Sequence, residues 1–149
     1  MRRSEMTPEL IKLSKRAKEL GFPQDVEEGD LVVEHEYGQN IYRLRYPTVY
    51  KDGSIDDEDD NRDIRFQARS DHWFLIMEFS RCLEWLREQG CYTWLVGFTE
   101  KDTKPLFVHV YRGNEIFEGE GKSIEECGAK AVCKILSEGQ EVKILEEEG

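Results

Sequence analysis

Apolar residues near the amino terminus recur at spacings of three and four, which is typical of one face of an amphipathic helix. Thr7 is a candidate N-cap, and Pro8 suits the first helical position, where its missing N–H costs nothing. Gly21 suits the position just after a helix, and Pro23 prevents the helix from continuing. The pattern therefore predicts a helix between Thr7 and Gly21. Its expected buried face consists of Leu10, Leu13, Ala17 and Leu20.

The segment that follows is typical of a β-hairpin. Residues 31–37 are rich in β-forming side chains, and residues 41–46 alternate large apolar side chains with arginine. Turn-forming residues at 38–40 separate the two runs. Pro47 suits the end of a strand or an edge strand, because it cannot donate a ladder hydrogen bond.

Residues 51–63 form a dense acidic block. Like charges at this density cannot bury themselves, so we expect a loop or flexible linker there. The block is therefore the best candidate for a domain boundary. The expected division is a helix–hairpin element in residues 1–66, with an acidic loop at 51–63, and a second domain in residues 67–149.

The carboxy-terminal half predicts the order α-β-β-β-α. Ser70 or Asp71 would begin a helix that runs to about Gln89, and strands are expected at 92–98, 106–111 and 115–120. Ser123 and Glu126 match a capping box, so a second helix should begin there and end at Gly139. Short turns favour antiparallel pairing, with both helices on one face of the sheet. The expected fold class is α+β, an N-terminal helix and hairpin followed by an αβββα sandwich.

Composition limits the classes of function. The chain has 149 residues and a formal net charge of -11, which excludes a broad basic surface for nucleic acid or anionic lipid. Apolar runs all fall short of the roughly 20 residues that span a bilayer, so no membrane partner is expected. The first residues lead into a charged helix rather than an apolar signal core, which predicts a cytoplasmic protein.

Five residues before the last helix carry a resemblance. Gly119-Glu120-Gly121-Lys122-Ser123 resembles the turn that precedes the final helix of double-stranded-RNA-binding domains. That family places a lysine pair next and another lysine one helical turn later. Here the corresponding positions hold Ile124, Glu125 and Gly128. The resemblance therefore implies the fold without the cations that contact phosphate, and a nucleic-acid partner is not expected.

A closer resemblance is to the phage ABA sandwich domains, small phage and prophage proteins with the same topology. Residues 85–90 and 121–126 are similar to the two ends of that domain, and residues 13–24 resemble the opening of other phage proteins. This resemblance implies an αβββα fold and a phage or prophage accessory role. It implies no activity, and fold alone would not supply one.

Motifs for catalysis or metal binding are weak in this chain. Alternating acids in residues 52–63 only loosely resemble a calcium loop, because Asp57 stands where the glycine of the turn would be needed. The four cysteines and three histidines lack the spacing of paired metal ligands. We therefore expect no catalytic, cofactor-binding or metal-binding residues. An enzyme would need His109, a cysteine such as Cys133 and a carboxylate to converge in a pocket.

Aromatic residues are the remaining signal. The candidate interaction surface comprises Tyr92, Trp94, Phe98 and Trp73, because tyrosine and tryptophan are enriched where proteins meet. Packing inside the protein is the alternative reading of the same residues. The surface reading predicts a non-catalytic protein that acts through protein–protein contacts or self-association. Two alternatives stay open, an acidic nucleic-acid mimic that inhibits a DNA-binding protein and a degenerate nucleic-acid-binding module.

Overall fold

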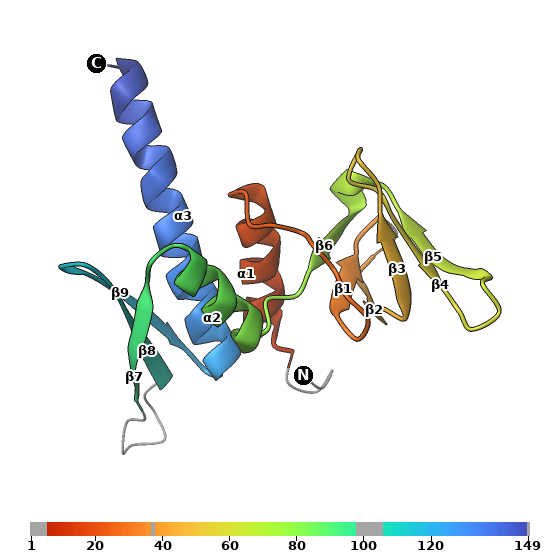
Figure 1. Ribbon diagram of the computed structural model, residues 1–149, viewed down its shortest axis with the longest axis horizontal. Coiled ribbons are helices and arrows are strands. Elements are labelled where there is room, and N and C mark those ends of the chain that lie inside the picture. The colour runs from red at the N-terminus through yellow and green to blue at the C-terminus, as the bar shows by residue number, and fades with distance from the viewer. Residues whose placement is uncertain (1–5, 37, 98–105, 149) are drawn as a thin grey trace. The chain divides into compact units, whose positions relative to one another are not determined.

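The computed structural model describes residues 6–36, 38–97 and 106–148 (Figure 1). The protein is α+β, and its described part contains three α-helices and three small antiparallel sheets. The chain forms two compact units. Unit 1 contains Met1–Phe22 and Met77–Gly149, and unit 2 contains Pro23–Ile76. These units do not coincide with the division into 1–66 and 67–149 that the acidic block suggested.

Helix α1 (Pro8–Glu19) confirms the first prediction. The Thr7 side chain accepts a hydrogen bond from the Leu10 N–H at 3.1 Å. At the other end, Gly21 has a φ of 103°, a left-handed conformation that favours glycine. The Phe22 N–H then donates to the Ala17 carbonyl at 2.9 Å, which closes a Schellman turn.

Helix α2 (Phe79–Glu88) begins later than expected, so the prediction of a helix from residue 70 is wrong. Ser70–His72 form a short 3-10 turn, η2, and Trp73–Leu75 form strand β6 in unit 2. All three β6 side chains are buried. A short, continuously apolar run suits a buried strand as well as a buried helix, and its pairing with another strand decided between them.

Unit 1 contains one sheet with the strand order β7-β8-β9. The strands are β7 (Tyr92–Gly97), β8 (Leu106–Arg112) and β9 (Glu115–Gly121), which confirms the three predicted strands. A two-residue turn joins β8 to β9, and its first residue, Gly113, has a φ of 61°.

Helix α3 (Ile124–Glu148) begins at the predicted cap. The Ser123 hydroxyl accepts from the Glu126 N–H at 3.3 Å, while the Glu126 carboxylate accepts from the Lys122 N–H at 3.1 Å. The helix does not end at Gly139, so that prediction is wrong. Strong helix formers follow this glycine, and one glycine costs a helix only about 1 kcal/mol.

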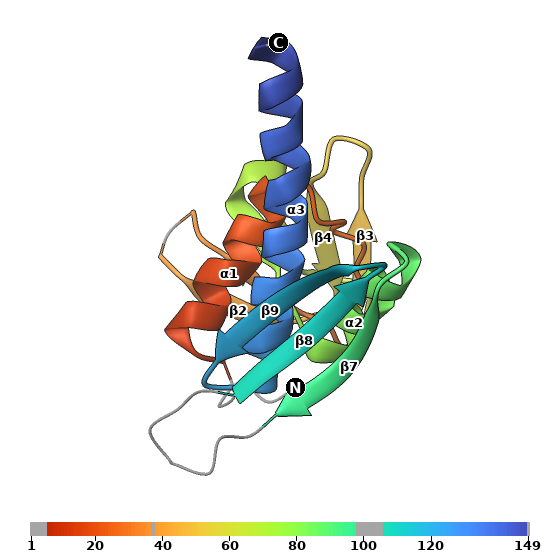
Figure 2. The same cartoon turned by 90° about the vertical axis from the view of Figure 1, so that its left-hand side faces the viewer.

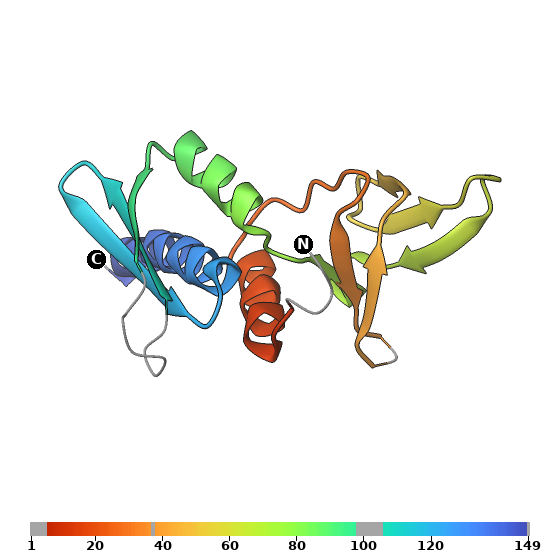
Figure 3. The same cartoon turned by 90° about the horizontal axis from the view of Figure 1, so that it is seen from below.

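The helices of unit 1 lie on one side of its sheet (Figures 1 and 3). Helix α3 packs against β8 and β9 and also contacts α1 and α2. Gly119 permits this close approach, because a Cβ there would lie 2.0 Å from the Cys127 carbonyl oxygen. The buried side chains on this side of the sheet include Val108, Val110 and Phe117.

Unit 2 contains two sheets, with the strand orders β2-β1-β6 and β3-β4-β5. Strands β1 and β2 form the predicted hairpin, but its second strand ends at Arg43, and Tyr46 belongs to the next sheet. Pro47 lies in β3, which is an edge strand, as its missing N–H allows. The remaining bounds are β1 (Leu31–Glu34), β2 (Asn40–Arg43), β3 (Tyr46–Val49), β4 (Ile55–Glu58) and β5 (Ile64–Ala68). One core joins both sheets, consisting of Val32, Leu44, Ile55, Phe66, Ala68, Trp73 and Leu75.

The acidic block is not a loop, which corrects the prediction for residues 51–63. Strand β4 lies inside the block and is the central strand of its sheet. Ile55 and Asp57 point into the core and are 0% and 1% exposed. The alternating side chains of a strand allowed the segment to bury these two residues while its other acids stay at the surface.

None of the helices in the described part of the chain is long and apolar enough to cross a bilayer.

Candidate interaction surface

The side of the unit 1 sheet that faces away from α3 carries aromatic and acidic side chains. Figure 2 looks onto this side. Cross-strand pairing places Tyr92 beside Tyr111 and Tyr111 beside Ile116, and it places His109 beside Glu118. We call this surface the outer face. It consists of Tyr92, Phe107, His109, Tyr111, Ile116, Glu118 and Glu120.

The alternation of strand β8 builds the outer face. Val108 and Val110 are fully buried on the helix side. The intervening residues Phe107, His109 and Tyr111 therefore project to the opposite side, because successive side chains of a strand alternate. The ring centroids of Phe107 and His109 are 5.1 Å apart, and those of His109 and Tyr111 are 6.5 Å apart. The central strand thus presents a continuous line of three rings.

Glycine on the neighbouring strand makes room for one of these rings. A Cβ at Gly97 would lie only 2.0 Å from the Phe107 ring. The Phe107 ring therefore packs directly over the β7 backbone, which broadens the aromatic line across two strands.

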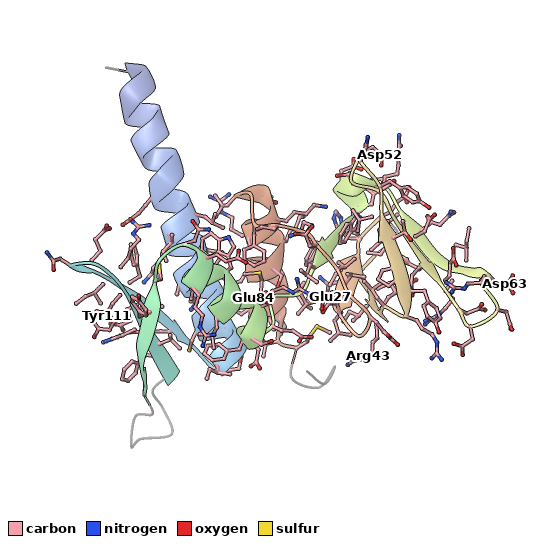
Figure 4. The ribbon with its side chains drawn as sticks, viewed as in Figure 1. Glu27, Arg43, Asp52, Asp63, Glu84 and Tyr111 are labelled. Atoms are coloured by element: carbon pink, nitrogen blue, oxygen red, sulfur yellow. The ribbon has the colours of Figure 1, made fainter. Side chains whose placement is uncertain are left out.

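The exposed apolar area of the outer face is concentrated in one cross-strand row. Tyr92 is 68% exposed and Ile116 is 61% exposed. Tyr111, labelled in Figure 4, lies between them in the register of the sheet. Exposed apolar side chains gathered in one place are typical of a surface that another molecule covers.

Two carboxylates lie on the same face beside the rings. The His109 Nε2 atom is 3.2 Å from the Glu118 Oε2 atom. The contact between Glu118 and Glu120 lowers the pKa of Glu118, and the contact with His109 lowers it further by a smaller amount. The contact with Glu118 and its negative charge raise the pKa of Glu120. The positive charges of Lys130 and Lys134 on α3 act in the opposite direction and offset part of this increase.

Of the four predicted surface residues, the structure describes the side chains of Tyr92 and Trp73. Tyr92 lies on the outer face. Trp73 is 1% exposed in the core of unit 2, where its indole N–H donates to the Gly53 carbonyl at 2.9 Å, so its assignment to an exposed surface is wrong. The side chain of Trp94 and all of Phe98 lie outside the described part of the chain.

Sequence reasoning missed most of the outer face, although the signal was present. Phe107, His109 and Tyr111 alternate with two valines, which indicates a strand with one aromatic face. The contribution of Ile116, Glu118 and Glu120 follows from the register between β8 and β9, which the two-residue turn at residues 113 and 114 sets.

The cysteines and His109 do not converge. Burial raises the pKa of Cys127 and of Cys133 to about 11 in each case, and burial also raises the pKa of Cys82 and Cys91. These shifts suppress the thiolate, which is the nucleophilic form. Cys133 Sγ is directed at the Leu13 carbonyl of α1, 3.7 Å away, whereas His109 meets Glu118 on the outer face.

Two acids of the 51–63 block, Asp57 and Asp60, are engaged within unit 2. Asp57 accepts hydrogen bonds from the N–H groups of Arg45 and Tyr46, both at 2.9 Å. Arg45 also forms two hydrogen bonds with the Asp60 carboxylate, at 2.6 and 2.7 Å. No group of three histidine, cysteine or acidic residues in the described ranges could hold a metal ion.

The other histidines lie in unit 2. His35 packs against Phe74 with ring centroids 5.7 Å apart and meets His72 edge-on. His72 lies 3.4 Å from the Glu36 carboxylate. Both histidines therefore lie in a different unit from the outer face.

Comparison with family models, characterised proteins and solved structures found no match to this chain. The resemblances to phage ABA sandwich domains and to double-stranded-RNA-binding domains therefore stay predictions.

Proposed function

We propose that this protein is a non-catalytic binding protein whose outer face binds a positively charged protein. The observation that carries the proposal is the exposed row of Tyr92, Tyr111 and Ile116 next to the carboxylates of Glu118 and Glu120. Tyrosine rings offer contact area at a low cost in side-chain entropy, and their faces attract cations. A phage or prophage accessory role, as the sequence resemblance implies, fits such binding.

Charge favours a basic partner over a second copy. The two carboxylates would complement lysine or arginine, and the net charge of -11 would speed the approach of a basic protein. Two copies that met through the outer face would bring their glutamates together, which is unfavourable. The same charge opposes nucleic acid, because duplex binding depends on neutralising phosphates.

Nucleic-acid mimicry is the less favoured alternative. A mimic would need exposed carboxylates in a ridge. In the acidic block Asp57 is buried, and Asp60 is paired with Arg45. Those two carboxylates stabilise unit 2 and are not available to imitate phosphates.

Capture of partners from nuclease-treated host extract tests the proposal with matched variants. Tyr92→Ser removes an exposed ring from the outer face, and Glu120→Lys reverses a charge there. Ile64→Ser and Glu84→Lys are the controls, since Ile64 is exposed in unit 2 and Glu84 lies on α2 (Figure 4). We expect one basic protein that the controls retain and that both outer-face variants bind about tenfold more weakly, a difference of about 1.4 kcal/mol.

Three outcomes would contradict the proposal. The first is capture of an acidic protein. The second is equal binding of the captured protein by all four variants. The third is a concentration-dependent dimer, measured by sedimentation, that Tyr92→Ser abolishes, because the outer face would then be occupied by a second copy.

A further inference from the structure

The β3-β4-β5 sheet of unit 2 carries rings and carboxylates on the side that faces away from its core. In β4, Ile55 and Asp57 are buried. Asp56 and Glu58 therefore project to the opposite side, because successive side chains of a strand alternate. Cross-strand pairing places Tyr46 of β3 directly beside Glu58. This side of the sheet thus sets a tyrosine ring next to a carboxylate.

The pair of Tyr46 and Glu58 holds a guanidinium of the protein itself. The Arg62 guanidinium lies over the Tyr46 ring, 4.8 Å from its centroid. The Arg62 Nη1 atom is 3.8 Å from the Glu58 Oε2 atom. A guanidinium is planar and charged, so it can stack on a ring and pair with a carboxylate at the same time. The contact indicates which side chain such a pair accepts.

A second tyrosine–carboxylate pair, Tyr50 and Asp56, lies next to the first. The Tyr50 hydroxyl donates to the Asp56 Oδ2 atom at 2.6 Å, and Tyr50 is 49% exposed. Among the described residues, no lysine or arginine lies within ion-pair distance of the Asp56 carboxylate. The hydrogen bond to Asp56, desolvation and the negative charges of Asp56 and Glu58 all raise the pKa of Tyr50. The second pair therefore has a negative surrounding and a neutral partner where the first has a guanidinium.

Unit 2 carries most of the negative charge of the protein. Residues 23–76 contain 14 acidic and 6 basic residues, a net charge of -8 out of -11 for the whole chain. Such a charge attracts a basic segment from a distance and raises its rate of association. The partner that complements the second pair is therefore basic.

We propose that Tyr50 and Asp56 bind an arginine side chain of another protein. The guanidinium stacks on the exposed Tyr50 ring and pairs with the Asp56 carboxylate. Arg62 makes the same two contacts with Tyr46 and Glu58. Lysine fits less well, because its ammonium is a point charge without a planar face. A second copy of this chain is a poor occupant, because both copies carry a net charge of -11.

This site is independent of the partner proposed for the outer face. Tyr50 and Asp56 lie in unit 2, whereas the outer face belongs to unit 1. Each proposal can therefore fail alone.

Peptide titration of the full-length protein, followed by amide NMR, tests the site. The probe is an acetylated, amidated peptide of glycine and serine with two arginines, and its match carries two lysines instead. We expect the arginine peptide to shift the amide signals of Tyr50 and Asp56. It should bind roughly three- to tenfold more tightly than the lysine peptide, which has the same charge.

Substitutions separate the parts played by the charge and the ring. Asp56→Asn removes the charge and keeps an oxygen that can accept from Tyr50, and Tyr50→Leu removes the ring. Each should weaken binding of the arginine peptide roughly three- to tenfold. Tyr50→Phe keeps the ring and should bind like the wild type. Circular dichroism checks that the variants fold.

Glu27→Gln is the matched control for Asp56→Asn, because it removes one negative charge from the same unit. Glu27 is exposed and precedes β1, outside the β3-β4-β5 sheet (Figure 4). This variant should bind the arginine peptide like the wild type.

Three results would overturn the inference. One is equal binding of the arginine and lysine peptides, including no binding of either. Another is an effect of Asp56→Asn no larger than that of Glu27→Gln. The third is a set of shifted signals confined to outer-face residues such as Tyr92 and Tyr111, which would place the peptide on unit 1 and leave the proposed function standing.

Discussion

At the scale of single residues, Asp57 holds the start of strand β3. Its carboxylate is buried, accepts from the N–H groups of Arg45 and Tyr46, and lies 3.5 Å from the Arg65 guanidinium. A buried donor that loses its acceptor has no water to replace it. An acid from the block that we expected to be a loop or linker is therefore a structural group.

We expect Asp57→Ala to lower the free energy of unfolding by about 1–3 kcal/mol, because two backbone N–H groups lose their acceptor. Asp57→Asn should cost less, since its amide oxygen can still accept from both. Urea denaturation measures the changes, and Asp71→Ala, at a side chain that is 79% exposed, is the control. An Asp57→Ala loss no larger than that of Asp71→Ala would contradict this role.

Asp60 gives a prediction about pH. The hydrogen bonds from Arg45 lower the pKa of Asp60. A carboxyl group whose pKa is lower in the folded state stabilises the protein at neutral pH, and this contribution is lost as pH falls through that pKa. Arg45→Gln should raise the pKa of Asp60 toward its ordinary value, as followed by carboxyl carbon NMR. Arg16→Gln, which removes a different ion pair on α1, should leave it unchanged.

At the scale of elements, glycines set how closely α3 approaches its neighbours. Gly119 faces the backbone of α3, where a Cβ would lie 2.0 Å from the Cys127 carbonyl oxygen. Gly128 faces α2, where the nearest atom to an added Cβ is in the Phe79 ring at 3.0 Å. A ring can move aside, whereas the helix backbone can shift only with the whole helix.

We therefore expect Gly119→Ala to destabilise the protein by about 1–3 kcal/mol through overpacking. Gly128→Ala should cost much less, because alanine favours the helix by about 1 kcal/mol and offsets the contact with Phe79. Thermal unfolding followed by circular dichroism compares the two variants. Equal losses of stability in the two variants would contradict this prediction, because α3 would then move away from β9 at little cost.

At the scale of the whole molecule, unit 2 is an insertion in unit 1. The chain leaves unit 1 after Phe22 and returns at Met77. The two ends of unit 2 are bridged, because the Leu75 N–H donates to the Gln24 side-chain oxygen at 2.9 Å. Neighbouring ends are typical of a domain that can be inserted into another.

We expect a fragment of residues 23–76 to fold alone, giving a dispersed amide NMR spectrum. It holds all six strands of unit 2 and their shared core, although a chain of roughly 50–60 residues has a small stability margin. Residues 1–66 should stay unfolded, because that division cuts β5 and omits β6. A folded 1–66 fragment and an unfolded 23–76 fragment would reverse this assignment.

The sequence by itself determined the elements that are marked by capping residues, turn residues or a local alternation of side chains. The cap at Thr7, the glycine at 21, the serine at 123 and the aromatic alternation in β8 each fix backbone conformation within a few residues. Helix α1, the β1–β2 hairpin, strands β7–β9 and the start of α3 could therefore be predicted.

Tertiary structure decided what depends on distant partners. Residues 73–75 are a strand because β1 pairs with them. The acidic block contains β4 because β3 and β5 pair with it on both sides, and Ile55 and Asp57 are buried there. The outer face likewise depends on the pairing of β7 with β8, which places Tyr92 beside Tyr111. Pairing and burial between segments far apart in the chain do not show in the spacing of apolar and polar residues along a short segment. These features therefore became visible only in the folded protein.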